Sequence, residues 1–369
     1  MKKRAIAHVA VVAALLACGA TAGVPTQSTV ATPNQAAAGR TFASQIEALS
    51  EPGGYFDTDN LISNERSYLD VVPALRRLEV RGGAYVGVGP DQNFTYIAAV
   101  RPDIAFIVDV RRDNLLLHLL FKALFTLSGT RVEYLAALVG RPVPADVQDW
   151  RTAPIERIVV QMARPPLDAR GVDALRERVD QAIGRMGVKL SREDRETIDR
   201  FHRRFIESGV GLKFQSTGRP PQSHYPSFEE LLLGRDPSGE PANYLASDDR
   251  YQTVRRMQQD DLIVPVVGDL GGPRAVAAIG TLLQQRKLQL SAFYTSNVEF
   301  YLFGDARFDR FVANLAALPR AANSVVIRSV FGRFARGAGS TSHLQSTHSL
   351  VNGYAKGQFR YYGELIDGR

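Results

Sequence analysis

The chain has 369 residues, of which 45% are apolar and 22% charged, and its formal net charge is +7. This composition is typical of a globular protein long enough to bury one large core or two smaller ones, so it excludes a chain that is disordered throughout. Cys18 is the only cysteine. Its position near the N-terminus excludes disulfides, thiolate metal sites and a cysteine nucleophile from the rest of the chain.

The first 22 residues have the pattern of a secretory signal. A basic stretch, Lys2 to Arg4, precedes the apolar run Ala5–Ala17. That run is too short to span a bilayer, because a spanning helix needs about 20 apolar residues. We therefore predict a signal peptide over residues 1–22.

Two processing sites compete in this signal. The stretch Leu15–Gly19 resembles a bacterial lipobox, in which Cys18 becomes lipidated, whereas Ala20–Ala22 is an ordinary small-x-small cleavage site. Residues 23–41 follow as a flexible linker without helical or strand period. The sequence predicts a protein of the bacterial cell envelope, either periplasmic or anchored to the membrane through Cys18. The alternative is a cytoplasmic protein whose N-terminus only imitates a signal.

The most informative motif is an apolar strand at Ala84–Val88 that runs into closely spaced glycines and a helix at residues 93–100. A second apolar strand, Ile104–Val108, follows and ends at Asp109. Glycines at the end of such a strand let a ligand approach the backbone, and an acid at the next strand end can accept hydrogen bonds from ribose hydroxyls. The motif predicts an α/β fold with a nucleotide-type pocket.

Strand and helix patterns continue to alternate along the chain. We expect helices or strands at 63–78, 114–127, 171–186, 191–207, 262–267, 273–286, 288–294, 308–318, 324–330 and, as an edge strand, 357–362. Strands separated by helices of this length imply right-handed crossovers and a mostly parallel sheet. We therefore predict a Rossmann-like three-layer sandwich: a single α/β domain over residues 42–369 with a helical insertion at about 129–260. An added strand at 158–162 is the alternative for part of that insertion.

The first motif departs from the dinucleotide pattern, because the third glycine is missing and Pro90 removes a backbone N–H group from the turn. With Gly87-Val88-Gly89, Asp109 and the stretch Val266–Asp269, the chain resembles class I S-adenosylmethionine-dependent methyltransferases. The resemblance implies S-adenosylmethionine as the cofactor. The residues it marks as cofactor-binding are Gly87, Gly89, Asp91, Asn93, Asp109 and Asp269. The stretches Glu51–Asn60 and Val86–Phe94 also resemble a bacterial family of no established activity.

Polar residues just past a strand, in the stretch Tyr294–Glu299, predict the other wall of a ligand crevice. We expect that crevice to include Tyr55, Tyr294, Ser296, Asn297 and Glu299. Ser296 and Asn297 could equally cap the next turn. The Asn/Asp-Pro-Pro-aromatic motif of the methyltransferase acceptor side is absent.

Two functions remain open from the sequence. The first is an exported protein that keeps the methyltransferase-like fold and binds an adenosine-type molecule or a protein, with its crevice partly filled by the 50–60 loop or the insertion. The second is an active methyltransferase with an unknown acceptor; its catalytic residues cannot be named, because methyl transfer mainly requires positioning of two reactants.

Other sites are disfavoured by spacing. The Asp57-x-Asp59 pair lacks the later Gly and Glu of a calcium loop, and His343 and His348 are five residues apart, so we expect no metal. Neither a Gly-x-Ser-x-Gly elbow nor a Walker loop occurs. Arginines form only small clusters, so no nucleic-acid partner is expected.

Overall fold

The computed structural model describes residues 41–58, 60–216, 225–335 and 339–367. A six-stranded sheet in the order β3-β2-β1-β4-β5-β6 forms its centre. The first five strands in this order of neighbours run parallel, and β6 is antiparallel to β5. The predicted signal, Cys18 and almost all of the predicted linker lie outside the described residues.

The strands are β1 Ala84–Gly87, β2 Ile104–Asp109, β3 Ile263–Val267, β4 Leu290–Ser296, β5 Arg320–Phe331 and β6 Ser340–Ser346. The α-helices are α2 Phe42–Leu49, α3 Val72–Arg77, α4 Gln92–Val100, α5 Arg112–Leu127, α6 Arg131–Val139, α7 Ile155–Gln161, α8 Ala169–Gly184, α9 Arg192–Ser208, α10 Phe228–Leu232, α11 Asp248–Gln259, α12 Ala275–Arg286, α13 Val298–Gly304, α14 Phe308–Ala317, α15 Thr347–Ala355 and α16 Tyr362–Asp367. Short 3₁₀ turns lie at Val147–Trp150, Gly209–Gly211 and Gly332–Phe334.

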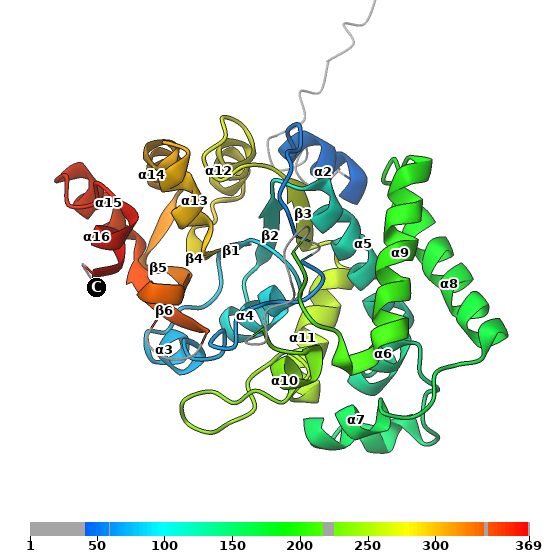
Figure 1. Cartoon of the computed structure of the whole chain (residues 1–369). Helices are drawn as coiled ribbons and strands as arrows, with labels where there is room; N and C mark the ends of the chain where they lie inside the picture. Colours follow the sequence, from blue (N-terminus) through cyan, green and yellow to red (C-terminus); the bar gives the residue numbers. More distant parts are fainter. Residues whose placement is uncertain (1–40, 59, 217–224, 336–338, 368–369) are drawn as a thin grey trace, which may run out of the picture.

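Helices cover both faces of the sheet, as predicted for a Rossmann-like three-layer sandwich. In Figure 1, α12 and α14 lie above the sheet, and α4 and α11 lie below it. Strands β1 and β3 are buried along their whole length, which explains their continuous apolar sequence. Helix α5 has buried residues all round because the sheet lies on one side of it and α8 and α9 on the other.

Between α5 and β3, the described residues form helices, turns and isolated bridges, but no strand of the sheet. The alternative strand at 158–162 is wrong, because residues 158–161 belong to helix α7 and Met162 is its C-cap. Helix α9 begins where predicted: Ser191 accepts a hydrogen bond from the Asp194 N–H, and the Asp194 carboxylate accepts one from the Ser191 N–H.

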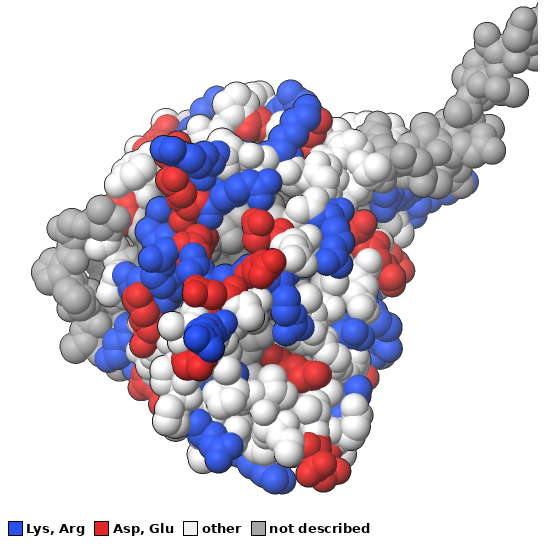
Figure 2. All heavy atoms as spheres, turned by 90° about the vertical axis from the view of Figure 1, so that its right-hand side faces the viewer, with Lys and Arg blue, Asp and Glu red and all other residues white. Residues whose placement is uncertain are grey.

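Helices α8 and α9 form the right-hand side of the molecule in Figure 1, and Figure 2 shows that face directly. Side chains of both signs alternate on it. Ion pairs join the two helices, for example Arg176 with Asp199 and Arg195 with Asp180. Among the described residues, no helix is both long enough and apolar enough to cross a membrane.

Two expected elements are wrong. The helix expected over 63–78 is limited to α3, and residues 66–71 form turns. The edge strand expected at 357–362 is instead a turn and an irregular stretch that leads into α16 at Tyr362, and β6 takes the edge. In the first segment, the Ser67 hydroxyl bonds the Ser340 and Ser342 hydroxyls of β6 at 2.8 and 3.0 Å. Buried polar residues of this kind do not appear in the apolar periodicity from which elements are predicted.

Candidate functional site

A cavity of about 640 Å³ lies at the carboxyl ends of the parallel strands. The register places Gly87 opposite both Ile107 of β2 and Tyr294 of β4, so β1 stands where the strand order reverses. Open α/β sheets bind ligands in the crevice at this switch point. The cavity volume falls within the range of about 300–1,000 Å³ that is typical of small-molecule sites.

Gly87 and Asn93 pack against each other beneath the cavity and do not line it. A Cβ on Gly87 would lie 2.0 Å from the Asn93 Oδ1. The Asn93 amide donates to the carbonyls of Val88 and Pro90 at 2.8 Å and accepts from the Tyr85 hydroxyl at 2.8 Å. The two residues therefore hold the turn after β1 in shape, and neither is placed to bind a cofactor.

Gly89 lines the cavity, and its φ of +79° explains why a glycine stands there. Its carbonyl accepts a hydrogen bond at 2.9 Å from Nε2 of His118 on α5. Burial lowers the pKa of His118 to about 4, so the ring is neutral at neutral pH. The nearest atom to a Cβ built on Gly89 would be the Asn60 amide nitrogen, and Asn60 also lines the cavity.

Asp91 is buried behind the cavity wall instead of lining it. Its carboxylate accepts a hydrogen bond from the Tyr244 hydroxyl at 3.1 Å. Burial raises the pKa of Asp91 to about 7, and the bond from Tyr244 opposes that rise.

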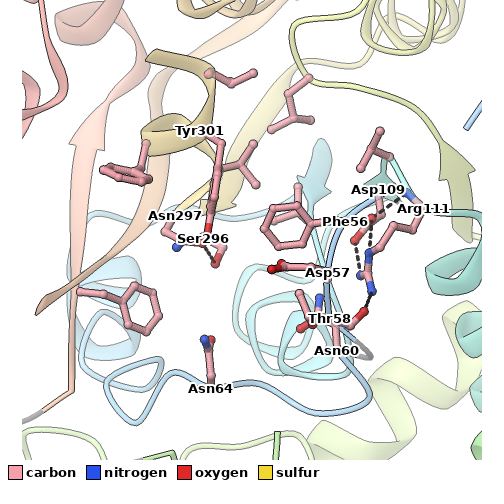
Figure 3. A pocket seen from close by; sticks show the side chains of 18 of the residues that line it. Phe56, Asp57, Thr58, Asn60, Asn64, Asp109, Arg111, Ser296, Asn297 and Tyr301 are labelled. Carbon is pink, nitrogen blue, oxygen red and sulfur yellow. Dashed lines mark hydrogen bonds and ion pairs between the residues drawn. The ribbon is translucent and has the colours of Figure 1, made fainter. Parts of the chain in front are cut away.

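Asp109 lines the cavity at the end of β2, but Arg111 holds both of its carboxylate oxygens. Oδ1 accepts from the Arg111 backbone N–H at 2.9 Å and from its Nε at 3.1 Å, and Oδ2 accepts from Nη2 at 2.9 Å. Arg111 also donates to the Thr58 carbonyl at 2.9 Å. The acid expected to bind ribose therefore anchors an arginine that fastens the 51–58 loop (Figure 3).

Asp269 also lines the cavity and is paired in a similar way. Its Oδ1 accepts from the Gly271 N–H at 2.9 Å, and its Oδ2 accepts from Arg307. Glu51 of the loop accepts hydrogen bonds from the backbone N–H groups of Asp269 and Arg274, at 2.8 and 3.1 Å. These backbone groups follow the end of β3, so the loop closes the sheet edge there.

The 51–58 loop forms one wall of the cavity. Figure 3 shows Phe56 and Asp57 on one side, and Ser296, Asn297 and Tyr301 on the other. The Phe56 and Tyr301 rings meet edge to face with centroids 4.9 Å apart. Tyr55 stands at the rim and is 80% exposed.

The end of β4 supplies the opposite wall. Ser296 and Asn297 line the cavity, whereas Tyr294 and Glu299 are buried behind it. Glu299 forms a bidentate ion pair with Arg328 of β5, at 2.6 and 2.9 Å, and both side chains are fully buried. Glu299 is therefore a structural residue of the β4–β5 packing and not a ligand of the crevice.

Glu65 is a cavity residue that the sequence did not predict. It is buried, and its carboxylate accepts hydrogen bonds from the hydroxyls of Tyr294 at 2.7 Å, Ser329 at 2.6 Å and Ser296. Burial raises its pKa, and the three hydroxyls oppose that rise. Residues 63–78 were expected to form a helix, and an acid in the first turn of a helix is ordinary. The sequence therefore gave no reason to select Glu65.

Two polar atoms of cavity-lining side chains have no hydrogen-bond partner among the described residues: Gln92 Oε1 and Thr58 Oγ1. Gln92 is 6% exposed, and its Nε2 donates to the Tyr294 hydroxyl at 2.8 Å. An unpaired buried acceptor costs about 1–3 kcal/mol. Both atoms are buried, so a ligand donor reaches them only when the side chains rotate toward the cavity.

Acids outnumber bases in the described cavity lining. The acids are Asp57, Glu65, Asp109, Asp269 and Asp305, and the bases are Arg111 and Arg307. Each of these arginines is already paired with an acid. Such a lining disfavours phosphate and other anions.

The residues expected to hold S-adenosylmethionine do not fit it in that role. Asp109 and Asp269 are bound by arginines, Gly87 is covered by Asn93, and Asp91 and Asn93 are buried. Of the predicted residues, the structure brings Gly89, Asp109, Asp269, Tyr55, Ser296 and Asn297 together around the cavity. No group of acidic, histidine or cysteine residues that could hold a metal occurs in the described part of the chain.

A family model described as a domain of unknown function (DUF7790) matches residues 61–142 and 229–359. The matched segments contain the whole sheet and leave out residues 143–228, which include α7, α8 and α9. No curated protein matches the chain.

Proposed function

The chain belongs to this family of unknown function, and from its own cavity we propose that it is an exported, lipid-anchored protein that binds an adenosine-type small molecule without phosphate groups. The ligand occupies the cavity between the 51–58 loop and the end of β4. Export and lipidation at Cys18 rest on the sequence of the signal alone.

The cavity at the switch point, with Gly89 in its lining, carries this proposal, because a ligand can approach the backbone there. Gln92 lines the same cavity, but its unpaired Oε1 is buried, so a hydrogen bond from a ligand requires the side chain to rotate. An adenine amino group or a ribose hydroxyl would then be the donor. The aromatic rings of Phe56 and Tyr301 add apolar walls that suit a flat base.

The acid excess of the lining supports a ligand without phosphate. A nucleotide would bring negative charge next to Asp57, Asp269 and Asp305, while Arg111 and Arg307 are engaged by their own acids. Adenosine and cationic adenosine derivatives avoid that repulsion.

Isothermal titration calorimetry of the purified protein with adenosine, AMP and S-adenosylmethionine tests the proposal. We expect adenosine to bind with a Kd below about 1 mM, which corresponds to about −4 kcal/mol, and AMP to bind at least about tenfold more weakly. AMP that binds as tightly as adenosine, or adenosine without measurable heat at millimolar concentration, would contradict the proposal. S-adenosylmethionine that binds with much higher affinity than adenosine would favour the methyltransferase alternative.

Two aromatic variants separate cavity binding from surface binding. Phe56→Ala removes a ring from the wall, and we expect it to weaken adenosine binding about tenfold or more. Tyr361→Ala is the matched control, because Tyr361 is 60% exposed and does not line the cavity. Equal losses in both variants would place binding elsewhere.

Export is tested separately by cell fractionation and mass spectrometry of the N-terminus. We expect a diacylated or triacylated Cys18 in the membrane fraction. A soluble cytosolic protein with an intact Met1 would contradict the localisation but leave the cavity test unaffected.

A further inference from the structure

We propose that Ser296 is a nucleophile, and Glu65 its general base, in the hydrolysis of carboxylic esters that enter the cavity. The inference goes beyond ligand binding. It uses the same cavity but does not require the ligand to be a nucleoside.

Ser296 has the backbone geometry that presents a nucleophile. It is the last residue of β4, its φ is +52°, and Asn297 and helix α13 follow directly. A non-glycine residue at positive φ is strained, and such residues cluster at functional sites. A sharp strand-to-helix turn of this kind holds the serine of α/β-hydrolases at the top of their sheet. The sequence concealed the turn, because Tyr294 and Val298 stand where those enzymes have glycines.

Glu65 is placed to take the proton of Ser296. The Ser296 hydroxyl donates directly to Oε1 of Glu65. Glu65 is 1% exposed, whereas Ser296 is half-buried and lines the cavity, so a substrate can reach the serine while the carboxylate stays desolvated. A nucleophile bonded to a base, which other groups orient in turn, is the general signature of nucleophilic catalysis.

Tyr294 and Ser329 are positioning residues for that base. They donate to Oε1 and Oε2 of Glu65 at 2.7 and 2.6 Å. The Ser329 hydroxyl also bonds that of Ser342 at 3.1 Å, which ties the site to the edge strand β6. Because burial raises the Glu65 pKa, the carboxylate is a stronger base than an exposed glutamate.

Asn297 lies beside the nucleophile, with its side-chain Oδ1 at 3.5 Å from the Ser296 Oγ (Figure 3). The amide group of the same side chain can donate to an oxyanion that forms next to Ser296. Removal of a single donor of this type lowers kcat by about 100-fold to 1,000-fold.

The reaction has two steps with water as the second reactant. Ser296 Oγ attacks the ester carbonyl carbon, its proton passes to Glu65, and the carbon–oxygen bond to the alcohol breaks as Glu65 returns the proton to the alcohol. Glu65 then takes a proton from water, whose oxygen attacks the acyl carbon. The acid leaves as Ser296 regains its proton.

A fluorophosphonate probe tests the nucleophile in the purified full-length chain. Ser296 displaces fluoride from the phosphorus atom of the probe. We therefore expect the rest of the probe on Ser296 when the protein is digested and analysed by mass spectrometry. In parallel, we expect p-nitrophenyl acetate hydrolysis to fall at least about 100-fold in kcat for Ser296→Ala and at least about tenfold for Glu65→Gln with little change in KM. Ser349→Ala, which removes an exposed serine of α15, is the matched control and keeps the wild-type rate.

An absent Ser296 adduct in protein that gives a folded circular dichroism spectrum overturns the proposal, as does an unchanged rate in Ser296→Ala. The labelling experiment uses the unmodified chain, so its result does not depend on whether a variant folds. Calorimetry separates the two proposals: an adduct without adenosine binding removes only the ligand, and adenosine binding without an adduct removes only the nucleophile.

Discussion

Asp91 is a buried acid whose replacement by asparagine tests the electrostatics of the region behind the cavity. Its pKa rises from 3.8 to about 7, mainly because burial penalises the charged form. Well below pH 3.8 the carboxyl group is protonated in both the folded and the unfolded chain. Between pH 4 and 7 the unfolded chain ionises first, so the free energy of unfolding falls as the pH rises.

The size of this effect follows from the shift. Three pKa units at 1.36 kcal/mol each amount to about 4 kcal/mol, reached near pH 7 and constant above it. Asp91→Asn does not titrate, and its side-chain oxygen can still accept the Tyr244 hydrogen bond. We therefore expect the variant to gain stability relative to wild type by about 1.4 kcal/mol per pH unit between pH 4.5 and 7.

Urea unfolding followed by circular dichroism at several pH values between 4.5 and 8 measures this difference. Asp194→Asn is the control, because the hydrogen bond from Arg112 lowers the pKa of Asp194. That stabilisation is present above pH 4 and lost only as the pH falls further, so the control difference is flat over the same range. A flat difference for Asp91→Asn as well would refute the assignment of a raised pKa to Asp91.

Three further substitutions test the packing around the site. Gly87→Ala places a Cβ 2.0 Å from the Asn93 Oδ1, so we expect thermal unfolding at a lower Tm and a loss of about 1–3 kcal/mol. Arg328→Met leaves Glu299 buried without its cation and costs about 3–5 kcal/mol, and adding Glu299→Gln recovers part of that loss in a denaturant double-mutant cycle. Glu51→Ala removes the acceptor of two backbone N–H groups near the start of α12, which costs about 1–2 kcal/mol and speeds amide hydrogen exchange there.

Strands β1 to β4 were predictable because they are buried on both faces. Ala84–Gly87 and Ile263–Val267 appear in the sequence as continuous apolar runs, and the long connections between strands imply parallel crossovers. The same logic predicted the all-round apolar helix α5. These elements depend on local composition, which the sequence displays directly.

The edge strand and the segment before α3 were not predictable in that way. Ser340 and Ser342 of β6 are buried with Ser67, and the hydroxyls satisfy one another across more than 270 positions of the chain. Glu65 belongs to the same kind of contact. A hydroxyl or carboxyl group that finds its partner only in the folded state looks in the sequence like a residue of a solvated turn.

The candidate acids show why residue type and position do not settle chemical role. Asp109 is at the strand end where a ribose-binding acid belongs, but Arg111 follows two residues later and takes both of its oxygens. The side chains of this pair are only 8% and 11% exposed, and breaking such a pair costs about 3–5 kcal/mol. A ribose hydroxyl contributes about 1.5–3 kcal/mol by bonding a charged group, too little to displace the arginine. The Asp109–Arg111 pair therefore fixes the 51–58 loop that encloses the cavity, and the nucleoside that we propose as the ligand would have to be held by other residues of the lining.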